Sequence, residues 1–320
     1  MFYETTKLCG VQGAKLIELI VTCSRSKCQP ATTGLKIRSM AEMPVNRRVI
    51  SWISRLKEGV GDQIHISNLY KGDNWTNAMR ASHRVVSSGG SYWVCSAGYG
   101  LVPQTAKLFP YSATFSPGDP DTIVYPARWW EQLATWTGPS PGHPRLIKEL
   151  VEIKPNNLIL VVVSKPYLIA LTQDLICARN AMRSPSNLII ICVGAPTDHP
   201  LKNNILQCDS RIQNQVGGAL ISINNRIAST LLSEIPESEW SADSFHKRVT
   251  EWMRLIPPRI SRVGKIATDD NIKEFISQEF IDSTNRSKTS LLKKFRQRGN
   301  ACLDARFARI FSEVQAENCS

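Results

Sequence analysis

Two uninterrupted apolar runs, NLILVVV at 157–163 and NLIIICV at 187–193, place the strongest constraint on the fold. Neither run alternates between apolar and polar residues, so a strand formed by either one would be buried on both faces. Such strands occupy the centre of parallel sheets whose faces are covered by helices. The chain is therefore predicted to be an α/β protein with a mostly parallel sheet flanked by helices.

The rest of the first 235 residues continues this alternation of strands and helices. Further strands are expected at 15–22, 63–70, 92–95 and, at a sheet edge, 219–223; helices are expected at 46–58, 74–86, 128–137, 144–153 and from Tyr167 to about 182. Four of the expected strands end in polar loops, at 23–27, 96–101, 164–167 and 194–200. Because ligands bind outside the carboxyl ends of parallel strands, these loops are expected to face one another on one rim.

Residues 89–121 form the least ordinary stretch of the chain. A Gly-Gly turn and a short strand lead into Ser96-Ala97-Gly98-Tyr99-Gly100. Glycines at alternate positions allow positive φ angles and a close approach of the backbone to a ligand. The roughly 25 residues that follow show no clear periodicity, which is typical of a binding loop. A long surface crossover is the alternative interpretation.

The loop after the first strand reads Cys23-Ser24-Arg25-Ser26-Lys27. Hydroxyl groups and backbone amides at the carboxyl end of a strand can hold a phosphate or the edge of a nucleobase, and Lys27 adds positive charge. The loop is thus a candidate anion or base pocket, with a solvated basic loop as the alternative.

A change of character near residue 236 predicts a second domain, so that 1–235 is the α/β domain and 236–320 a small helical domain. Three apolar stripes in the last 50 or so residues indicate a trihelical, helix-turn-helix-like unit. Between Arg286 and Arg309 eight Lys and Arg residues face one acid, Asp304, which accounts for +7 of the formal net charge of +12. Clustered cations favour contact with the phosphate backbone of nucleic acid. The candidate contacts are Arg286, Lys288, Lys293, Lys294, Arg296, Arg298 and Arg306.

Composition indicates which cellular compartment, cofactors and partners to expect for the protein. The nine cysteines contain no Cys-x-x-Cys pair, so reduced thiols in the cytoplasm are expected and no zinc site, metal or other cofactor is predicted. No run of 18 uncharged apolar residues occurs, so no membrane association is expected. The positive charge favours a polyanionic partner, DNA or RNA, although a merely basic enzyme would show it as well.

Three motifs occur in a fixed order: Cys-Ser-x-Ser-Lys at 23–27, Ser-Ala-x-x-Gly-Leu-Val at 96–102 and Pro-Tyr-x-x-Thr at 110–114. Together they resemble an uncharacterised bacterial and phage family with a uracil-DNA-glycosylase-like α/β fold, to which the archaeosine-synthase core is related. His199-Pro200 also resembles the His-Pro loop of these glycosylases. The chain departs from the pattern at Ser112, where the family often has Asp, and in loop 23–27, which lacks the acid or amide of the glycosylases.

The resemblance implies a DNA glycosylase that excises a modified base after base flipping, a chemistry some such proteins use against phage DNA. The implied base pocket comprises Cys23, Ser24, Ser26, Ser96, Gly98, Tyr99, Gly100, Tyr111, Ser164, Lys165, Tyr167 and Asp198. Asp119 or Asp121 would supply the carboxylate, with Asp198 as a third option, and His199 or Lys27 would stabilise the leaving base. Two alternatives stay open: a non-catalytic nucleic-acid-binding stress protein, and a transferase that modifies a base in DNA or tRNA.

Overall fold

The computed structural model describes residues 16–257, 264–282 and 287–317, which form two compact units divided between Pro257 and Pro258. The first unit is built on a five-stranded sheet of order β4–β3–β1–β6–β7. These strands span Ile17–Thr22 (β1), Ser91–Ser96 (β3), Gly100–Pro103 (β4), Leu158–Val162 (β6) and Leu188–Ile191 (β7). Only β4 runs antiparallel to its neighbour. The expected α/β class with a mostly parallel sheet is confirmed.

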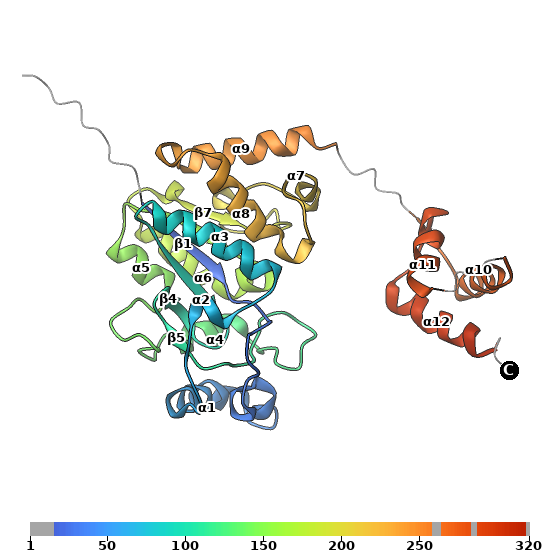
Figure 1. Ribbon diagram of the computed structural model, residues 1–320, viewed down its shortest axis with the longest axis horizontal. Helices are drawn as coiled ribbons and strands as arrows, with labels where there is room; N and C mark the ends of the chain where they lie inside the picture. The colour runs from blue at the N-terminus through green and yellow to red at the C-terminus, as the bar shows by residue number, and fades with distance from the viewer. Residues whose placement is uncertain (1–15, 258–263, 283–286, 318–320) are drawn as a thin grey trace, which may run out of the picture. The chain divides into compact units, whose positions relative to one another are not determined.

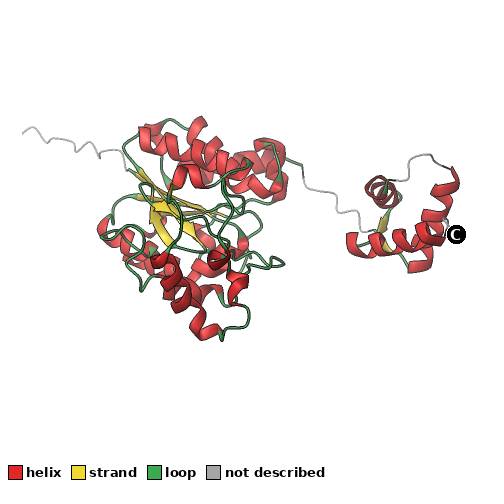
Figure 2. Cartoon of the chain, turned by 60° about the horizontal axis from the view of Figure 1, so that its bottom comes forward, coloured by secondary structure: helices red, strands yellow, loops and turns green. Residues whose placement is uncertain are grey.

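Helices cover both faces of the sheet (Figure 1). From β1 the chain moves to β3 through α3 (Asp73–Ser87), and from β6 it moves in the opposite direction to β7 through α6 (Lys165–Ala181). Because parallel crossovers are right-handed, opposite directions place these helices on opposite faces. α8 (Ile223–Glu234) packs beside α3, whereas α4 (Pro126–Leu133) and α5 (Ile147–Ile153) pack beside α6. Figure 2 shows the strands between the two helical layers.

The central strands are buried along their whole length, as their apolar sequences predict. The one charged residue of β1, Glu18, is only 1% exposed. Its carboxylate accepts hydrogen bonds from Trp93 Nε1 at 2.9 Å, Lys154 Nζ at 2.7 Å and Asn157 Nδ2 at 3.0 Å. These donors compensate the carboxylate for its lost hydration.

Two expected strands are wrong. Within 63–70 only Ile64–His65 forms a strand (β2), and Tyr70 makes an isolated bridge to Lys27. Between them Ile66–Leu69 (α2) is a helical turn capped by the His65 ring, which accepts a hydrogen bond from the Ser67 amide at 3.4 Å. Residues 219–223 form a 3-10 turn at Leu220–Ser222 that leads directly into α8. The Ser222 hydroxyl bonds to the Ala219 carbonyl at 3.0 Å and so stabilises the turn locally.

The stretch at 96–121 contains more regular structure than its sequence predicts. Its first part closes a hairpin between β3 and β4. Further on, Lys107–Leu108 (β5) pairs antiparallel with β2. The expected helix at 144–153 begins later, at Ile147, because the Glu149 side chain accepts the amides of Arg145 and Leu146 and thereby sets the start of α5.

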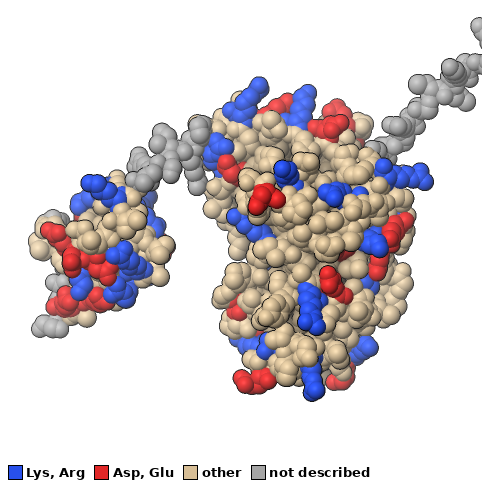
Figure 3. Space-filling view, turned by 180° about the vertical axis from the view of Figure 1, so that it is seen from behind, with Lys and Arg blue, Asp and Glu red and all other residues tan. Residues whose placement is uncertain are grey.

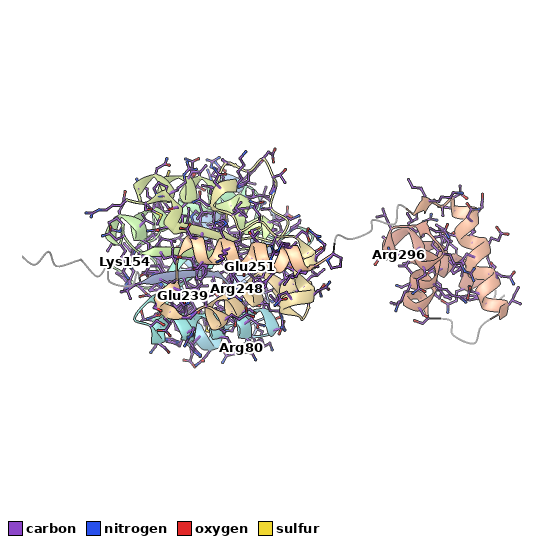
Figure 4. The ribbon with its side chains drawn as sticks, turned by 90° about the horizontal axis from the view of Figure 1, so that it is seen from above. Arg80, Lys154, Glu239, Arg248, Glu251 and Arg296 are labelled. Atoms are coloured by element: carbon purple, nitrogen blue, oxygen red, sulfur yellow. The ribbon has the colours of Figure 1, made fainter. Side chains whose placement is uncertain are left out.

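The two units divide after residue 257. The sequence had suggested a boundary at residue 235. α9 (Ala242–Leu255) belongs to the first unit because Phe245, Val249 and Trp252 are buried in its core. On the same helix Arg248 pairs with Glu234 of α8 at 3.3 Å and with Glu251 at 3.8 Å (Figure 4). α1 (Val45–Glu58) and α7 (Gln213–Val216) complete this unit.

The second unit contains the three expected helices, α10 (Asp269–Asp282), α11 (Lys288–Gln297) and α12 (Asp304–Glu317). Two short parallel strands, Lys265–Ile266 (β8) and Asn300–Ala301 (β9), accompany them. The three apolar stripes meet in one core, whereas Leu303, just before α12, is 77% exposed. No helix among the described residues of either unit has the length and apolar character needed to span a membrane.

Candidate functional site

A cavity of about 350 Å³ lies at the carboxyl ends of β1 and β6. The strand order reverses between these two strands, since one connection leads from β1 to β3 and another from β6 to β7 in the opposite direction. The loops that follow β1 and β6 therefore separate and leave a crevice, the usual ligand site of an open α/β sheet. We call it the switch-point cavity. Its wall comprises Thr22–Ser26, Lys71–Asn74, Ala113, Thr114, Ser116, Val162–Ser164, Tyr167, Ile221, Asn224 and Asn225.

Five residues of the predicted base pocket meet in this wall: Cys23, Ser24, Ser26, Ser164 and Tyr167. They come from the loops after β1 and β6, which the sequence placed on one rim. The Cys23 thiol and the Tyr167 hydroxyl are 3.0 Å apart and hydrogen-bonded. Burial raises the pKa of Tyr167 well above its ordinary value, so the phenol remains protonated at neutral pH.

Three helices begin at the cavity. The first residues of α3, the N-cap Ser164 of α6 and the first turn of α8 all lie in its wall. None of these three N-termini is capped by a side chain of the described residues. The first backbone N–H groups of α3 lack intrahelical acceptors. In contrast, α6 has Pro166 in its first turn, and the Ile223 amide at the start of α8 donates to the Leu220 carbonyl.

Asp73, the first residue of α3, is a carboxylate in the wall that the sequence analysis missed. It accepts a hydrogen bond from the Ser222 hydroxyl at 2.5 Å and pairs with Arg226 at 2.7 Å. The Ser222 hydroxyl and the Arg226 guanidinium hold the pKa of Asp73 below its ordinary value, so this carboxylate is ionised at neutral pH. No local motif marked Asp73, because its partners are about 150 residues away in the sequence.

Two adjacent amides of α8, also missed, differ in their bonding. Asn224 is satisfied at both ends, accepting from the Val193 amide and donating to the Val163 carbonyl, each at 2.9 Å. Asn225 is 2% exposed and donates to Asn74 Oδ1 at 2.9 Å. Its own Oδ1 has no hydrogen-bond partner among the described atoms. The only sequence signal was the pair of asparagines at a helix start, a position that polar residues commonly occupy.

The β3–β4 turn, which looked like a ligand loop in the sequence, is closed by core side chains. Trp52 Nε1 donates to the Gly98 carbonyl at 2.7 Å, and Trp129 Nε1 donates to the Ala97 carbonyl at 2.9 Å. The buried Arg145 guanidinium also donates to carbonyls of the hairpin, and burial lowers the pKa of Arg145 to about 10. The backbone groups that a ligand would use are already occupied.

Packing also explains the glycine at 98. A Cβ atom there would lie 2.5 Å from the Tyr111 ring, and the Tyr111 hydroxyl bonds to Ser96 Oγ at 2.6 Å. The Tyr99 hydroxyl is bonded to the backbone of Phe109. Both tyrosines are buried and neither can stack on a base. Five predicted pocket residues thus lie in the core rather than in the wall: Ser96, Gly98, Tyr99, Gly100 and Tyr111.

The two predicted catalytic aspartates of the long loop are engaged elsewhere. Asp121 is 1% exposed and accepts from the Arg38 side chain and from the Arg38 amide at 2.8 Å. Burial alone would raise the pKa of Asp121, but Arg38 and a hydrogen bond from Ser112 outweigh burial and hold it below the ordinary value. Asp119 is outside the wall and reaches it only through an ion pair with Arg25 at 2.7 Å.

The predicted donors also lie outside the wall. Lys27 Nζ donates to the Ser24 and Arg25 carbonyls at 3.2 and 3.3 Å, lies 4.3 Å from the centre of the Tyr111 ring, and has its pKa lowered by burial. Lys27 therefore shapes the loop after β1.

His199 Nε2 lies 3.2 Å from the Thr172 hydroxyl of α6, while Nδ1 accepts the Leu201 amide at 3.2 Å. Burial lowers the pKa of His199, so the ring is neutral at physiological pH. Lys165 and Asp198 are exposed and contribute nothing to the cavity. The loop after β7 thus begins at the same edge of the sheet as the loops after β1 and β6, as expected. It does not line the cavity.

Among the described cations of the second unit, most are paired within it. Lys294 and Arg298 contact Glu279 at 2.6 and 2.8 Å, and this carboxylate is 3% exposed. Arg296 pairs with Asp304 (Figure 4), and Arg306 pairs with Asp269. Figure 3 shows acidic and basic side chains interleaved on the visible face of this unit.

Two of the predicted nucleic-acid contacts on α11, Lys288 and Lys293, are still available. Both are exposed and make no ion pair with a described side chain. Arg286, another predicted contact, lies outside the described residues. Comparison of the chain with models of known protein families, with curated proteins and with solved structures finds no match.

Proposed function

We propose that the protein is a DNA glycosylase with a uracil-DNA-glycosylase-like fold, which hydrolyses the N-glycosidic bond of a modified base and acts, as the sequence resemblance implies, against phage DNA. The observation that carries this proposal is the ionised carboxylate of Asp73 in the wall of the switch-point cavity. A cavity of about 350 Å³ is large enough for one flipped nucleotide unit.

Asp73 would replace Asp119 and Asp121 as the carboxylate of the reaction. As the C1′–N bond breaks, positive charge develops on the sugar, and a fixed negative charge beside it lowers the barrier. A water oxygen then bonds to C1′, and its proton passes to the departing base, leaving an abasic site and a free base. Lys71, which lies in the wall and pairs with no described acid, supplies positive charge for the base anion in place of Lys27 and His199.

The test is mass spectrometry of free bases released from DNAs that carry different modified bases. Asp73→Asn should slow single-turnover release by about 100-fold or more, with a much smaller change in DNA binding, because carboxylates in this role contribute about 10²–10⁴-fold. Asp62→Asn, at an exposed position outside the wall, is the matched control and should release base at the wild-type rate. Equal rates for wild type and Asp73→Asn would remove Asp73 from the mechanism.

A non-catalytic nucleic-acid-binding protein is the second candidate, and one specific observation favours it. Each aspartate near the cavity is already matched by an arginine: Asp73 by Arg226 and Asp119 by Arg25. Carboxylates neutralised in this way are common in purely structural ion pairs. Tight binding of modified DNA without release of any base would select this candidate over the glycosylase.

A further inference from the structure

Tyr125, the residue before α4, has a backbone conformation that its side chain disfavours. Among the described residues it is the one non-glycine residue with a positive φ angle, at φ 58° and ψ 62°. A bulky side chain in this left-handed region costs free energy that Gly or Asn would avoid. Tyr125 is also 64% exposed, so packing within the unit offsets little of that cost. Because strained residues cluster at binding sites, the exposed ring points to a contact outside the core of the unit.

Other exposed apolar side chains surround this ring. α1 and α4 pack together through Trp52 and Trp129, whose ring centroids are 6.3 Å apart. A small hollow beside them is lined by Val45, Asn46, Val124, Tyr125, Arg128, Trp129 and Gln132. Ile50, one turn along α1 from Asn46, is 69% exposed. We call the lining residues and Ile50 the Tyr125 patch. Contiguous exposed apolar side chains of this kind mark interaction surfaces.

The charge beside the patch favours a polyanionic partner. Residues 36–58 contain six Lys and Arg residues and two acids. Arg38 pairs with Asp121, and the other five make no ion pair with a described acid: Lys36, Arg47, Arg48, Arg55 and Lys57. Arg128 of the patch is exposed and also lacks a described acid partner. Unlike most described cations of the second unit, these side chains are available to phosphates.

The patch lies at the same edge of the sheet as the switch-point cavity. Its two tryptophan contacts, to the carbonyls of residues 97 and 98, follow the carboxyl end of β3. The Ile123 amide donates at 2.9 Å to the carbonyl of Thr114, which lies in the cavity wall. Tyr125 is two residues beyond Ile123, so about 7 Å of chain separates it from that bond. Successive nucleotides of one strand in duplex DNA advance by about 3.4 Å. A strand with one nucleotide in the cavity can therefore reach the patch a few positions away.

We propose that the Tyr125 patch binds an unpaired nucleic-acid strand, with one base stacked on the Tyr125 ring and phosphates against Arg47 and Arg128. Aromatic rings beside cations hold single strands in this way because every base has a π face, whereas the bases of a duplex are already stacked on one another. The inference rests on the proposed function and deepens it, because the strand bound at the patch flanks the nucleotide in the cavity. The substrate is then a DNA whose target base has unpaired neighbours.

Fluorescence anisotropy of labelled oligonucleotides, with the full chain, tests the stacking contact. Tyr125→Asn removes the ring and suits a left-handed backbone, so it should keep the wild-type unfolding midpoint and bind single strands about tenfold more weakly. Tyr125→Phe retains the ring and should bind as wild type does. Leu255→Asn changes an exposed residue of α9 outside the patch and should leave affinity unchanged. Wild-type affinity of a folded Tyr125→Asn variant for single strands would overturn the inference.

The oligonucleotides are DNA and RNA of one sequence, each single-stranded and fully paired. Preference for the DNA or for the RNA strand identifies the source of the strand, and either supports the patch. An equal loss of affinity for single strands and for duplexes in Tyr125→Asn would contradict stacking on an unpaired base. A change of sedimentation in Tyr125→Asn without a change of binding would assign the patch to contacts between copies of the chain and overturn the proposal.

The cations of the patch have their own readout. Arg47→Ala combined with Arg128→Ala should weaken binding of any single strand. Each phosphate contact to a single strand contributes about 0.7 to the slope of log affinity against log salt, so the slope should fall by about 1.4. An unchanged slope would remove these arginines from the contact.

The patch and the glycosylase can fail separately. Base release by wild type, with no effect of Tyr125→Asn on single-strand binding, would retain the glycosylase and remove the patch. A tenfold loss of binding in Tyr125→Asn, with no base released from any DNA by wild type, would retain the patch and remove the glycosylase. Where both hold, Tyr125→Asn should raise the DNA concentration for half-maximal single-turnover release about tenfold and leave the maximal rate unchanged, because the ring contacts no reacting atom.

Discussion

The two units of the molecule carry positive charge in different ways. In the first unit the wall of the cavity combines the starts of α3, α6 and α8, which no N-cap side chain caps, with the cations Lys71 and Arg25. In the second unit the charge is on side chains, and most of the described Lys and Arg residues are paired with acids of the same unit, such as Glu279 and Asp269. Lysine and arginine in a sequence show where charge can be, but only the fold shows whether it is available to a partner.

The largest effect expected from this comparison concerns the buried carboxylate of Glu279. Replacing both Lys294 and Arg298 by Ala would leave this group, 3% exposed, without either of its cations. Removing the partners of a buried charge costs about 3 kcal/mol. Chemical denaturation of the second unit should show that loss. The double variant Lys288→Ala with Lys293→Ala should stay within about 0.5 kcal/mol of wild type, since these side chains have no described acid partner.

DNA affinity should show the opposite pattern, with a smaller effect. Lys288 and Lys293 are free to contact phosphates, so their double Ala variant should bind any DNA sequence about tenfold more weakly near 0.1 M salt. Each lost phosphate contact lowers the slope of log affinity against log salt by about 0.9, so the slope should fall by nearly 2. A salt titration of DNA binding measures both quantities. If the Lys294 and Arg298 variant, while folded, lost as much slope as the Lys288 and Lys293 variant, the division into paired and free cations would be wrong.

The smallest effect belongs to the first unit and appears only in acid. Arg38 and Ser112 hold the pKa of Asp121 below its ordinary value of 3.8, so the folded state favours the ionised form. This stabilisation is complete above the ordinary value and is lost as the pH falls through the lowered pKa of the folded state. The unfolding midpoints of wild type and Asp121→Asn should therefore differ at neutral pH and converge in strong acid. Asp62→Asn, at an exposed position, should follow wild type throughout; a gap between wild type and Asp121→Asn that persisted in strong acid would exclude this linkage.

The fold could be predicted where local periodicity decides it. The apolar runs at 157–163 and 187–193 became β6 and β7, and parallel pairing placed the loops after β1 and β6 at one edge. For this reason the sequence predicted correctly that Cys23, Ser164 and Tyr167 lie near one another. The strand expected at 63–70 was wrong because a capped helical turn of 4 residues in its middle buries Ile66 and Leu69.

The site was predicted poorly where distant parts of the chain decide it. Glycines serve ligand binding and close packing equally well, and only the positions of Trp52, Trp129 and Tyr111 show that Gly98 serves packing. Asp121 was predicted to be catalytic because of its place on the loop, yet its carboxylate forms an ion pair with Arg38. Asp73 was missed because its setting depends on α8, which the sequence offers no means to place beside α3.

The contacts between α3 and α8 also determine when the cavity can form during synthesis. Ser222, Asn225 and Arg226 bond to residues of α3 that precede them by 149, 151 and 153 positions, respectively. Ribosomes add residues at about 5–20 per second, so α3 leaves the ribosome many seconds before its partner helix exists. A nascent chain that ends before residue 223 has β1, β3 and β6 but one wall of the cavity missing. The complete cavity therefore forms only after α8 has been synthesised.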